Sequence, residues 1–344
     1  MKMTTMKMTT MNRTKMKRIA ISLLALCACT APAFGATSYK VTHAIAINGE
    51  ARWDYLYTDS AQHRLYLSHG TQTEIIDTQS EKLLATIPDT AGVHGIALAP
   101  DLGLGYTSNG KTDSITVFDL ATFKTVKTIK VGTNPDAIVY VAQSGRVVTF
   151  NGRSKDATVV DAKTGEVLGT VAIGGKPEFA QIDKAGNIHF NIEDTAELAS
   201  LDPKTMKLTR RISLKPCDSP TGLAIDDQQR LYSVCENKMM IVSGADDKKI
   251  AQAAIGSGPD GVAWMDGYAF SANGEDGTLS VVETASGKFD TVATVATASG
   301  ARTIAADAAA HKLYLPTSDF KPAADGGRRQ GVAGTFRILV VEKQ

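Results

Sequence analysis

Short apolar runs separated by polar turns fill the chain from residue 38 to residue 344. In one typical stretch, the run at residues 95–99 is followed by a turn, by a second run carrying Tyr106, and by a third run that ends on Asp119. A hairpin then leads to a fourth, outer run. The runs are rich in β-branched and aromatic residues, and none is long with a helical period. The pattern predicts groups of four short strands.

The groups recur with a period of about 42 residues. One equivalent position, the residue at the end of the loop before the first strand of each unit, measures the repeat length. These seven frame positions are Arg52, His94, Asp136, Glu178, Thr221, Asp260 and Arg302. Successive steps are 42, 42, 42, 43, 39 and 42 residues, so seven units fill the chain with almost nothing left over. One four-stranded unit per repeat is typical of a propeller blade. The sequence therefore predicts an all-β fold, a single seven-bladed β-propeller over residues 36–344.

The ends of the chain predict how the ring closes. The segment at residues 39–47 matches a fourth, outermost strand, whereas the chain ends on residues 336–342, which match a third strand. We expect the N-terminal strand to complete the last blade.

The first 35 residues have a different character. They carry six basic residues, no acidic one, and an apolar run of 11 residues at 19–29. That run suits a secretory signal peptide and is shorter than the roughly 20 residues of a membrane span. We expect cleavage before Ala36 and a periplasmic or secreted protein without a transmembrane segment. A less favoured alternative is a lipoprotein anchored through Cys29, since residues 26–29 loosely resemble a lipobox.

Export changes the charge of the chain and the meaning of its cysteines. Without the signal, 31 Lys and Arg face 36 Asp and Glu, a net charge near −5 instead of the formal +1 of the whole chain. This charge disfavours nucleic-acid binding, which rests on a surplus of basic residues. Cys217 and Cys235 remain, and an antiparallel hairpin would bring them to one edge, so we expect a disulfide between them.

The seven frame positions are expected to form a ring at one mouth of the central channel. Most are charged, while the neighbouring inner strands are nearly uncharged. We interpret Arg52, His94, Asp136, Glu178, Asp260 and Arg302 as a polar funnel that binds a small charged ligand. The alternative is a set of solvated turn residues that pair with one another.

Loops on the same face add candidates, namely His69 and Arg153, and we expect His69 and His94 to come from the same face of one blade. His69, His94 and Asp136 would suit a metal site or an acid/base pair. Two histidines without a cluster of third and fourth ligands are weak support for a metal site, so no metal is assigned. Trp53-Asp54 lies at the start of an inner strand without a paired Gly-His and is not interpreted as a WD40 signature.

The seventh unit carries an insertion. Tyr106 and Asp119 are 13 residues apart, whereas the equivalent Tyr314 and Glu342 are 28 apart. The added polar, Gly-rich stretch belongs to the face of the ring, and we expect it to lean over the channel mouth. It would bring Lys321, Arg328 or Arg329 to an anionic ligand or partner; a salt bridge from loop to ring is the rival interpretation.

Several sequences such as residues 131–138 (Val-Gly-Thr-Asn-Pro-Asp-Ala-Ile) and residues 115–119 (Ile-Thr-Val-Phe-Asp) resemble the YVTN-repeat propellers, the YncE-like family of exported bacterial proteins. The resemblance covers nearly all of residues 38–344. It implies a periplasmic or surface binding protein; related seven-bladed propellers include lactonases and the propeller domains of electron-transfer enzymes.

The absence of other motifs narrows the chemistry. The chain has no Cys-x-x-Cys-His, P-loop, Gly-x-Ser-x-Gly or His-Glu-x-x-His sequence, so we expect no cofactor. The favoured hypothesis is a noncatalytic, monomeric propeller that binds a small molecule, a peptide or an envelope protein. The alternative is a lactonase-like hydrolase with His94 or Glu178 as general base and Arg52 or Arg302 stabilising an oxyanion.

Overall fold

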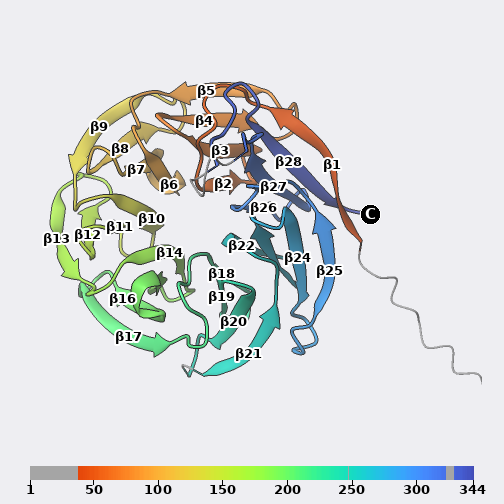
Figure 1. Cartoon of the computed structure of the whole chain (residues 1–344). Coiled ribbons are helices and arrows are strands. Elements are labelled where there is room, and N and C mark those ends of the chain that lie inside the picture. Colours follow the sequence, from red (N-terminus) through yellow and green to blue (C-terminus); the bar gives the residue numbers. More distant parts are fainter. Residues whose placement is uncertain (1–37, 247, 323–328) are drawn as a thin grey trace, which may run out of the picture. The chain divides into compact units, whose positions relative to one another are not determined.

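The computed structural model describes residues 38–246, 248–322 and 329–344. These residues form seven four-stranded antiparallel sheets arranged as blades around a common centre, which is the predicted β-propeller (Figure 1). The expected signal peptide, with Cys29, lies outside the described residues. Among the residues described, no helix is long and apolar enough to cross a membrane.

Each blade is built from consecutive strands, listed from the channel outward. Blade 1 contains β2 (Leu56–Asp59), β3 (Arg64–His69), β4 (Gln72–Asp77) and β5 (Leu83–Ile87). Blade 2 contains β6 (Val93–Ala99), β7 (Leu104–Asn109), β8 (Ser114–Asp119) and β9 (Thr125–Lys130). Blade 3 contains β10 (Pro135–Val141), β11 (Arg146–Asn151), β12 (Asp156–Asp161) and β13 (Val167–Ala172).

The remaining blades repeat this order. Blade 4 contains β14 (Pro177–Ile182), β15 (Ile188–Ile192), β16 (Glu197–Asp202) and β17 (Lys207–Ser213). Blade 5 contains β18 (Leu223–Ile225), β19 (Arg230–Cys235), β20 (Lys238–Ser243) and β21 (Lys249–Ala254). Blade 6 contains β22 (Pro259–Met265), β23 (Tyr268–Asn273), β24 (Thr278–Glu283) and β25 (Thr291–Ala296). Two short 3-10 turns, η1 (Pro100–Leu102) and η2 (Glu193–Thr195), interrupt the pattern.

Blade 7 joins the two ends of the chain. It contains β26 (Ala305–Asp307), β27 (Lys312–Thr317), β28 (Arg337–Lys343) and, outermost, β1 (Tyr39–Ala46). β1 pairs antiparallel with β28 from Tyr39 opposite Lys343 to Ala46 opposite Arg337. The expected closure by the N-terminal strand is therefore confirmed.

The core lies between neighbouring blades. Tyr66, Tyr106, Tyr232 and Tyr314 occupy the second strands of their blades and are almost completely buried. They explain the aromatic residue that recurs in the second run of the repeat, because each fills the space between two sheets. Tyr106 also donates a hydrogen bond to the Ala162 carbonyl of the next blade at 2.7 Å.

The acid that ends the third run of most repeats caps a hairpin. Asp119 Oδ1 accepts hydrogen bonds from the backbone N–H of Ala121 at 3.1 Å and of Thr122 at 2.7 Å. The hydrogen bonds from Thr122, including its hydroxyl, hold the pKa of Asp119 below its ordinary value. The same turn recurs after β4, β12, β16 and β24, so these acids are structural.

A disulfide links Cys217, in the loop before β18, to Cys235 at the end of β19. The S–S distance is 2.08 Å and the Cα atoms are 5.6 Å apart. The pairing is the one expected from the sequence, and it ties the loop that enters blade 5 to that blade.

Candidate functional site

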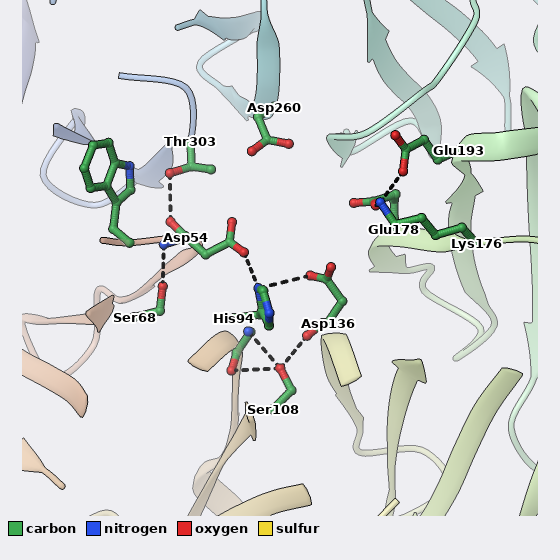
Figure 2. Close-up of polar contacts among 12 residues, drawn as sticks. Asp54, Ser68, His94, Ser108, Asp136, Lys176, Glu178, Glu193, Asp260 and Thr303 are labelled. Atoms are coloured by element: carbon green, nitrogen blue, oxygen red, sulfur yellow. Dashed lines mark hydrogen bonds and ion pairs between the residues drawn. The ribbon is translucent and has the colours of Figure 1, made fainter. Parts of the chain in front are cut away.

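The polar ring is formed where the inner strands begin. His94, Asp136, Glu178 and Asp260 are the second residues of β6, β10, β14 and β22. In each of these strands the register with the next strand shifts within the first residues, as in a β-bulge. A bulge redirects the side chain that it carries. Figure 2 shows His94, Asp136, Glu178 and Asp260 extending from different strands toward a shared space.

Blade 1 contributes a different residue from the one expected. Arg52 is exposed, and Asp54 takes its place at the mouth. The error comes from the spacing of the first repeat. Tyr66 and Tyr106, on equivalent strands, are only 40 residues apart, so a count of 42 back from His94 passes Asp54 and ends two residues beyond it, at Arg52. Asp54 is fixed through its backbone N–H, which donates to Ser68 Oγ at 2.8 Å.

Asp54, His94 and Asp136 form the centre of the site (Figure 2). His94 Nδ1 lies 2.5 Å from Asp54 Oδ2 and 3.9 Å from Asp136 Oδ1. Although burial by itself would lower it, the pKa of His94 is raised to about 9 by the hydrogen bond to Asp54 and the charges of both carboxylates. His94 is therefore an imidazolium at neutral pH.

Asp136 is the least satisfied member of this group. The residue is only 8% exposed. Its Oδ1 atom has no hydrogen-bond partner among the residues that the structure describes. Burial raises the pKa of Asp136 to about 6, with Asp54 and Asp260 adding to the increase and His94 opposing it. At neutral pH the site thus holds a buried carboxylate that has the His94 imidazolium 3.9 Å away but no hydrogen bond at Oδ1, and such an unsatisfied polar atom costs free energy.

Glu178 and Asp260 differ from Asp136 because each has a neighbouring cation. Lys176 Nζ lies 2.7 Å from Glu178 Oε1 and also contacts Glu193. Burial, together with the charge of Asp136, still raises the pKa of Glu178 to about 9. Arg302 Nε donates to Asp260 Oδ2 at 2.8 Å.

Arg302 is held in place on its other side as well. Its Nη2 donates to the Trp53 carbonyl at 3.0 Å, and its guanidinium lies over the Trp53 ring, 5.4 Å from the centroid. Arg302 Nη2 is 3.9 Å from Asp54 Oδ1. The arginine therefore connects blades 6, 7 and 1 at the mouth.

A cavity of about 250 Å³ adjoins the ring. It is lined by inner-strand residues of blades 1 to 4 that directly follow Asp54, His94, Asp136 and Glu178: Tyr55–Tyr57, Gly95–Leu98, Ala137–Tyr140 and Phe179–Ile182. Tyr55 and Phe179 meet edge to face, with ring centroids 4.7 Å apart. Burial, and then the charges of Asp136 and the other mouth carboxylates, raise the pKa of Tyr55 well above its ordinary value. The site thus combines a polar rim with a partly aromatic interior.

The remaining predicted residues have other positions. His69 belongs to blade 1, whereas His94 belongs to blade 2, so the expectation that both come from one blade is wrong. His69 is buried, with Nδ1 2.8 Å from Glu74 Oε1 and Nε2 2.6 Å from the Glu50 carbonyl. It is a structural residue. Arg153 is exposed, and Thr221 Oγ1 donates to the Pro259 carbonyl at 3.1 Å, which supports the start of β22.

The described ends of the insertion between β27 and β28 contact Trp53 and Ser299. Phe320 packs on the Trp53 ring, with centroids 6.0 Å apart. Lys321 is exposed, and Arg329 donates a hydrogen bond to Ser299 Oγ instead of to a ring carboxylate. Arg328 lies outside the described residues. Its role, and that of the loop in ligand binding, stays a prediction.

Sequence reasoning missed Asp54, Tyr55 and Lys176. The Trp53-Asp54 pair at the start of an inner strand was the available signal for the first two. Lys176 lies in the loop that enters blade 4, one residue outside the β14 strand. Its importance depends on the distance to Glu178, which no spacing rule reveals.

Comparison with known proteins agrees with the fold. No protein-family model and no curated protein matches the chain by sequence. The RRP9 WD40 repeats match with a TM-score of 0.72 and 8% identity over 89% of this chain and 100% of that one. U3-55K matches with a TM-score of 0.69 and 8% identity over 86% of this chain and 97% of that one. The fold is WD40-like.

A third similar structure is Kuenenia stuttgartiensis hydrazine synthase. It matches with a TM-score of 0.66 and 14% identity, over 77% of this chain and 92% of that chain. At such low identities the WD40-like architecture is shared and nothing about activity follows, because propellers host many unrelated functions.

Proposed function

We propose that this propeller, as a member of the YncE-like family, is exported to the periplasm and binds a small, positively charged ligand at the channel mouth without converting it. The observation that carries the proposal is the buried Asp136, whose Oδ1 has no hydrogen-bond partner among the described residues, lies 3.9 Å from His94 Nδ1, and faces the mouth beside a cavity. A cationic group placed there would compensate the carboxylate.

The charges at the mouth support a cation over an anion. Four acidic residues (Asp54, Asp136, Glu178 and Asp260) are gathered there, and the two cations, Lys176 and Arg302, already contact Glu178 and Asp260, which leaves Asp54 and Asp136 as the carboxylates open to a cation. The cavity supports a small ligand: about 250 Å³ is below the roughly 300–1,000 Å³ of pockets that hold drug-sized molecules. A nucleic-acid strand does not suit this mouth, because its phosphates would meet carboxylates.

The protonation states of the candidate bases disfavour the lactonase-like alternative. A general base must be unprotonated at the working pH. His94, with a pKa of about 9, is protonated at neutral pH, and so is Glu178, whose pKa is also about 9. Arg52, one of the two residues considered for the oxyanion, is exposed.

The proposal is tested on the protein purified from the periplasm. Its melting temperature is measured with small organic cations, divalent metal salts, carboxylates and neutral sugars, and lactone hydrolysis is assayed in parallel. We expect stabilisation by cations only and no turnover. Asp136→Asn should reduce the stabilisation, whereas Glu166→Gln, at an exposed carboxylate on the outer hairpin, should leave it unchanged. Selective stabilisation by anions, or lactone turnover that disappears in His94→Ala, would overturn the proposal.

A further inference from the structure

We propose that Asp54, His94 and Asp136 bind a first-row divalent transition metal ion, of which Zn²⁺ is the best match. The inference rests on the proposed function, since it names the cation that the mouth accepts. Among the described residues these three form a group whose ligand atoms all lie within 4.8 Å of one another.

The distances within this group fit a metal after small side-chain rotations. Zn²⁺ binds imidazole nitrogen and carboxylate oxygen at about 2.0–2.2 Å, which places tetrahedral ligand atoms about 3.4 Å apart. His94 Nδ1 is 2.5 Å from Asp54 Oδ2 and 3.9 Å from Asp136 Oδ1, on either side of that value. Figure 2 shows the His94 ring between the two carboxylates, all three side chains meeting at one point.

The Asp136 oxygen that lacks a hydrogen bond is the second observation that points to a ligand. Asp136 is 8% exposed, and its Oδ1 has no hydrogen-bond partner within the described part of the chain. Buried carboxylates are ordinarily paired or coordinate a metal. The other two acids of the mouth do not need one, since Glu178 contacts Lys176 and Asp260 contacts Arg302.

The backbone beneath the three ligands is held by hydroxyl groups. Ser68 Oγ accepts from the Asp54 N–H at 2.8 Å, and Thr303 Oγ1 donates to the Asp54 carbonyl at 2.8 Å. Ser108 Oγ accepts from the Gly95 N–H at 2.8 Å and donates to the Asp136 carbonyl. Figure 2 shows these contacts around the site. These hydrogen bonds hold the three residues in position without a metal, as hydrogen bonds to the ligating residues do in known metal sites.

The ligand set selects the metal class. His94 would bind as neutral imidazole, so the metal displaces the proton of its imidazolium into solvent. Imidazole favours Zn²⁺ and its first-row neighbours, whereas Ca²⁺ and Mg²⁺ prefer oxygen ligands only. Two carboxylates balance the double positive charge. Three protein ligands leave a fourth position open toward the cavity, where water or a small molecule would bind. Arg302 Nη2 lies 3.9 Å from Asp54 Oδ1, so its positive charge would oppose a cation held by that carboxylate.

Calorimetric titration of the chelator-treated periplasmic protein with ZnCl2 tests the inference, with MnCl2 and CaCl2 as comparisons. We expect one equivalent of Zn²⁺ to bind. Asp136→Asn and His94→Ala should each lower the Zn²⁺ affinity by about 100-fold or more, which exceeds the roughly 10- to 100-fold loss typical when a residue that only supports a metal ligand is replaced. His311→Ala is the matched control, because His311 and Asp266 form an exposed pair 2.6 Å apart and have no third ligand among the residues that the structure describes. It should bind Zn²⁺ like the wild type.

Melting of the metal-free variants separates binding from folding. Asp136→Asn removes a buried charge that lacks a hydrogen bond at Oδ1, so it should melt at or above the wild-type temperature without metal while losing Zn²⁺ affinity. Unchanged affinity in Asp136→Asn, or loss of affinity in His311→Ala, would overturn the site. If Zn²⁺ and Mn²⁺ fail to bind but an organic cation still stabilises the protein, the metal is wrong and the proposed function stands. Failure of every cation contradicts both.

Discussion

Glu178 illustrates how burial controls charge at a single residue of the mouth. Its side chain is 6% exposed and lies beside Lys176, yet burial and the charge of Asp136 raise its pKa from 4.5 to about 9. The folded protein therefore holds this proton more tightly than the unfolded chain does. The corresponding stability is fully present below pH 4.5 and is lost as the pH rises through about 9.

Glu178→Gln should remove this pH dependence. Glutamine keeps the shape and cannot ionise, so the variant should gain stability over the wild type as the pH rises from about 5 to 9, reaching on the order of 1–3 kcal/mol. Urea unfolding at several pH values measures the difference. The exposed Glu166→Gln should follow the wild type, and a parallel offset at every pH for Glu178→Gln would contradict the explanation.

Gly110 controls the position of His94. A Cβ atom at Gly110 would lie 2.6 Å from His94 Nε2 and 3.0 Å from Asn134 Oδ1. Gly110→Ala should therefore push the imidazole away from Asp54 and weaken cation binding at the mouth by about 10-fold, the scale of a displaced supporting contact. Gly103→Ala, where the new Cβ meets nothing within 4 Å but the backbone φ is +66°, controls for backbone strain. Equal cation affinity in wild type and Gly110→Ala would show that His94 has room to move.

Residue positions at the mouth were predictable only as far as the repeat is regular. His94, Asp136, Glu178 and Asp260 follow from the 42-residue frame, because each is the second residue of its inner strand. Asp54 does not, since the first repeat is shorter. The role of Lys176 depends on a side-chain contact that crosses the loop before β14, and sequence spacing contains no such distance.

At the scale of the element, β1 is the strand whose removal should matter most. Tyr39 and Ile45 are buried on it, and the Tyr39 ring lies 5.0 Å from that of Phe270 in blade 6. Deleting residues 36–47 of the exported chain removes these contacts, worth about 1.5–3 kcal/mol for each buried side chain, and exposes the edge of β28. We expect the melting temperature to fall by about 10 °C or more, at roughly 2–4 °C per kcal/mol.

Lys40→Ala provides the control for this deletion. Lys40 is exposed on the same strand and should melt within a degree or two of the wild type. Differential scanning calorimetry compares the three proteins. Wild-type melting of the deletion would mean that the ring does not depend on its N-terminal strand.

The Cys217–Cys235 disulfide should stabilise blade 5. It closes a loop with a sequence separation of 18 residues, and loops of this size contribute about 3 kcal/mol. A reducing agent should therefore lower the melting temperature of the wild type. The Cys217→Ala/Cys235→Ala double variant should melt at the reduced temperature with or without reductant, and a wild type that is insensitive to full reduction would contradict the expectation.

At the scale of the whole molecule, the number of blades and the closure of the ring were predictable from the sequence. They depend on the repeat length and on which strand of a blade lies at each end of the chain. The arrangement of charged side chains at the channel mouth was only partly predictable from the sequence. Seven frame positions predict a ring, but their pairing follows from which blades are neighbours: Arg302 meets Asp260 of blade 6 and lies near Asp54 of blade 1, across the closure. The inner cavity likewise depends on packing among blades 1 to 4.

The closing strand also has a kinetic consequence. The Gln344 N–H donates to the Ser38 carbonyl at 2.7 Å, so the first and last residues of the propeller are neighbours. Blades 1 to 6 are built from local hairpins and can form as the chain emerges, but the β1–β28 ladder joins residues about 300 positions apart in a chain of 344. Such contacts form late, since the entropy of closing the longest loop must be overcome first. The ring of blades therefore remains open until β28, the last strand of the chain, can pair with β1. A circular permutant whose chain begins between two blades would replace this slow long-range pairing with a local one.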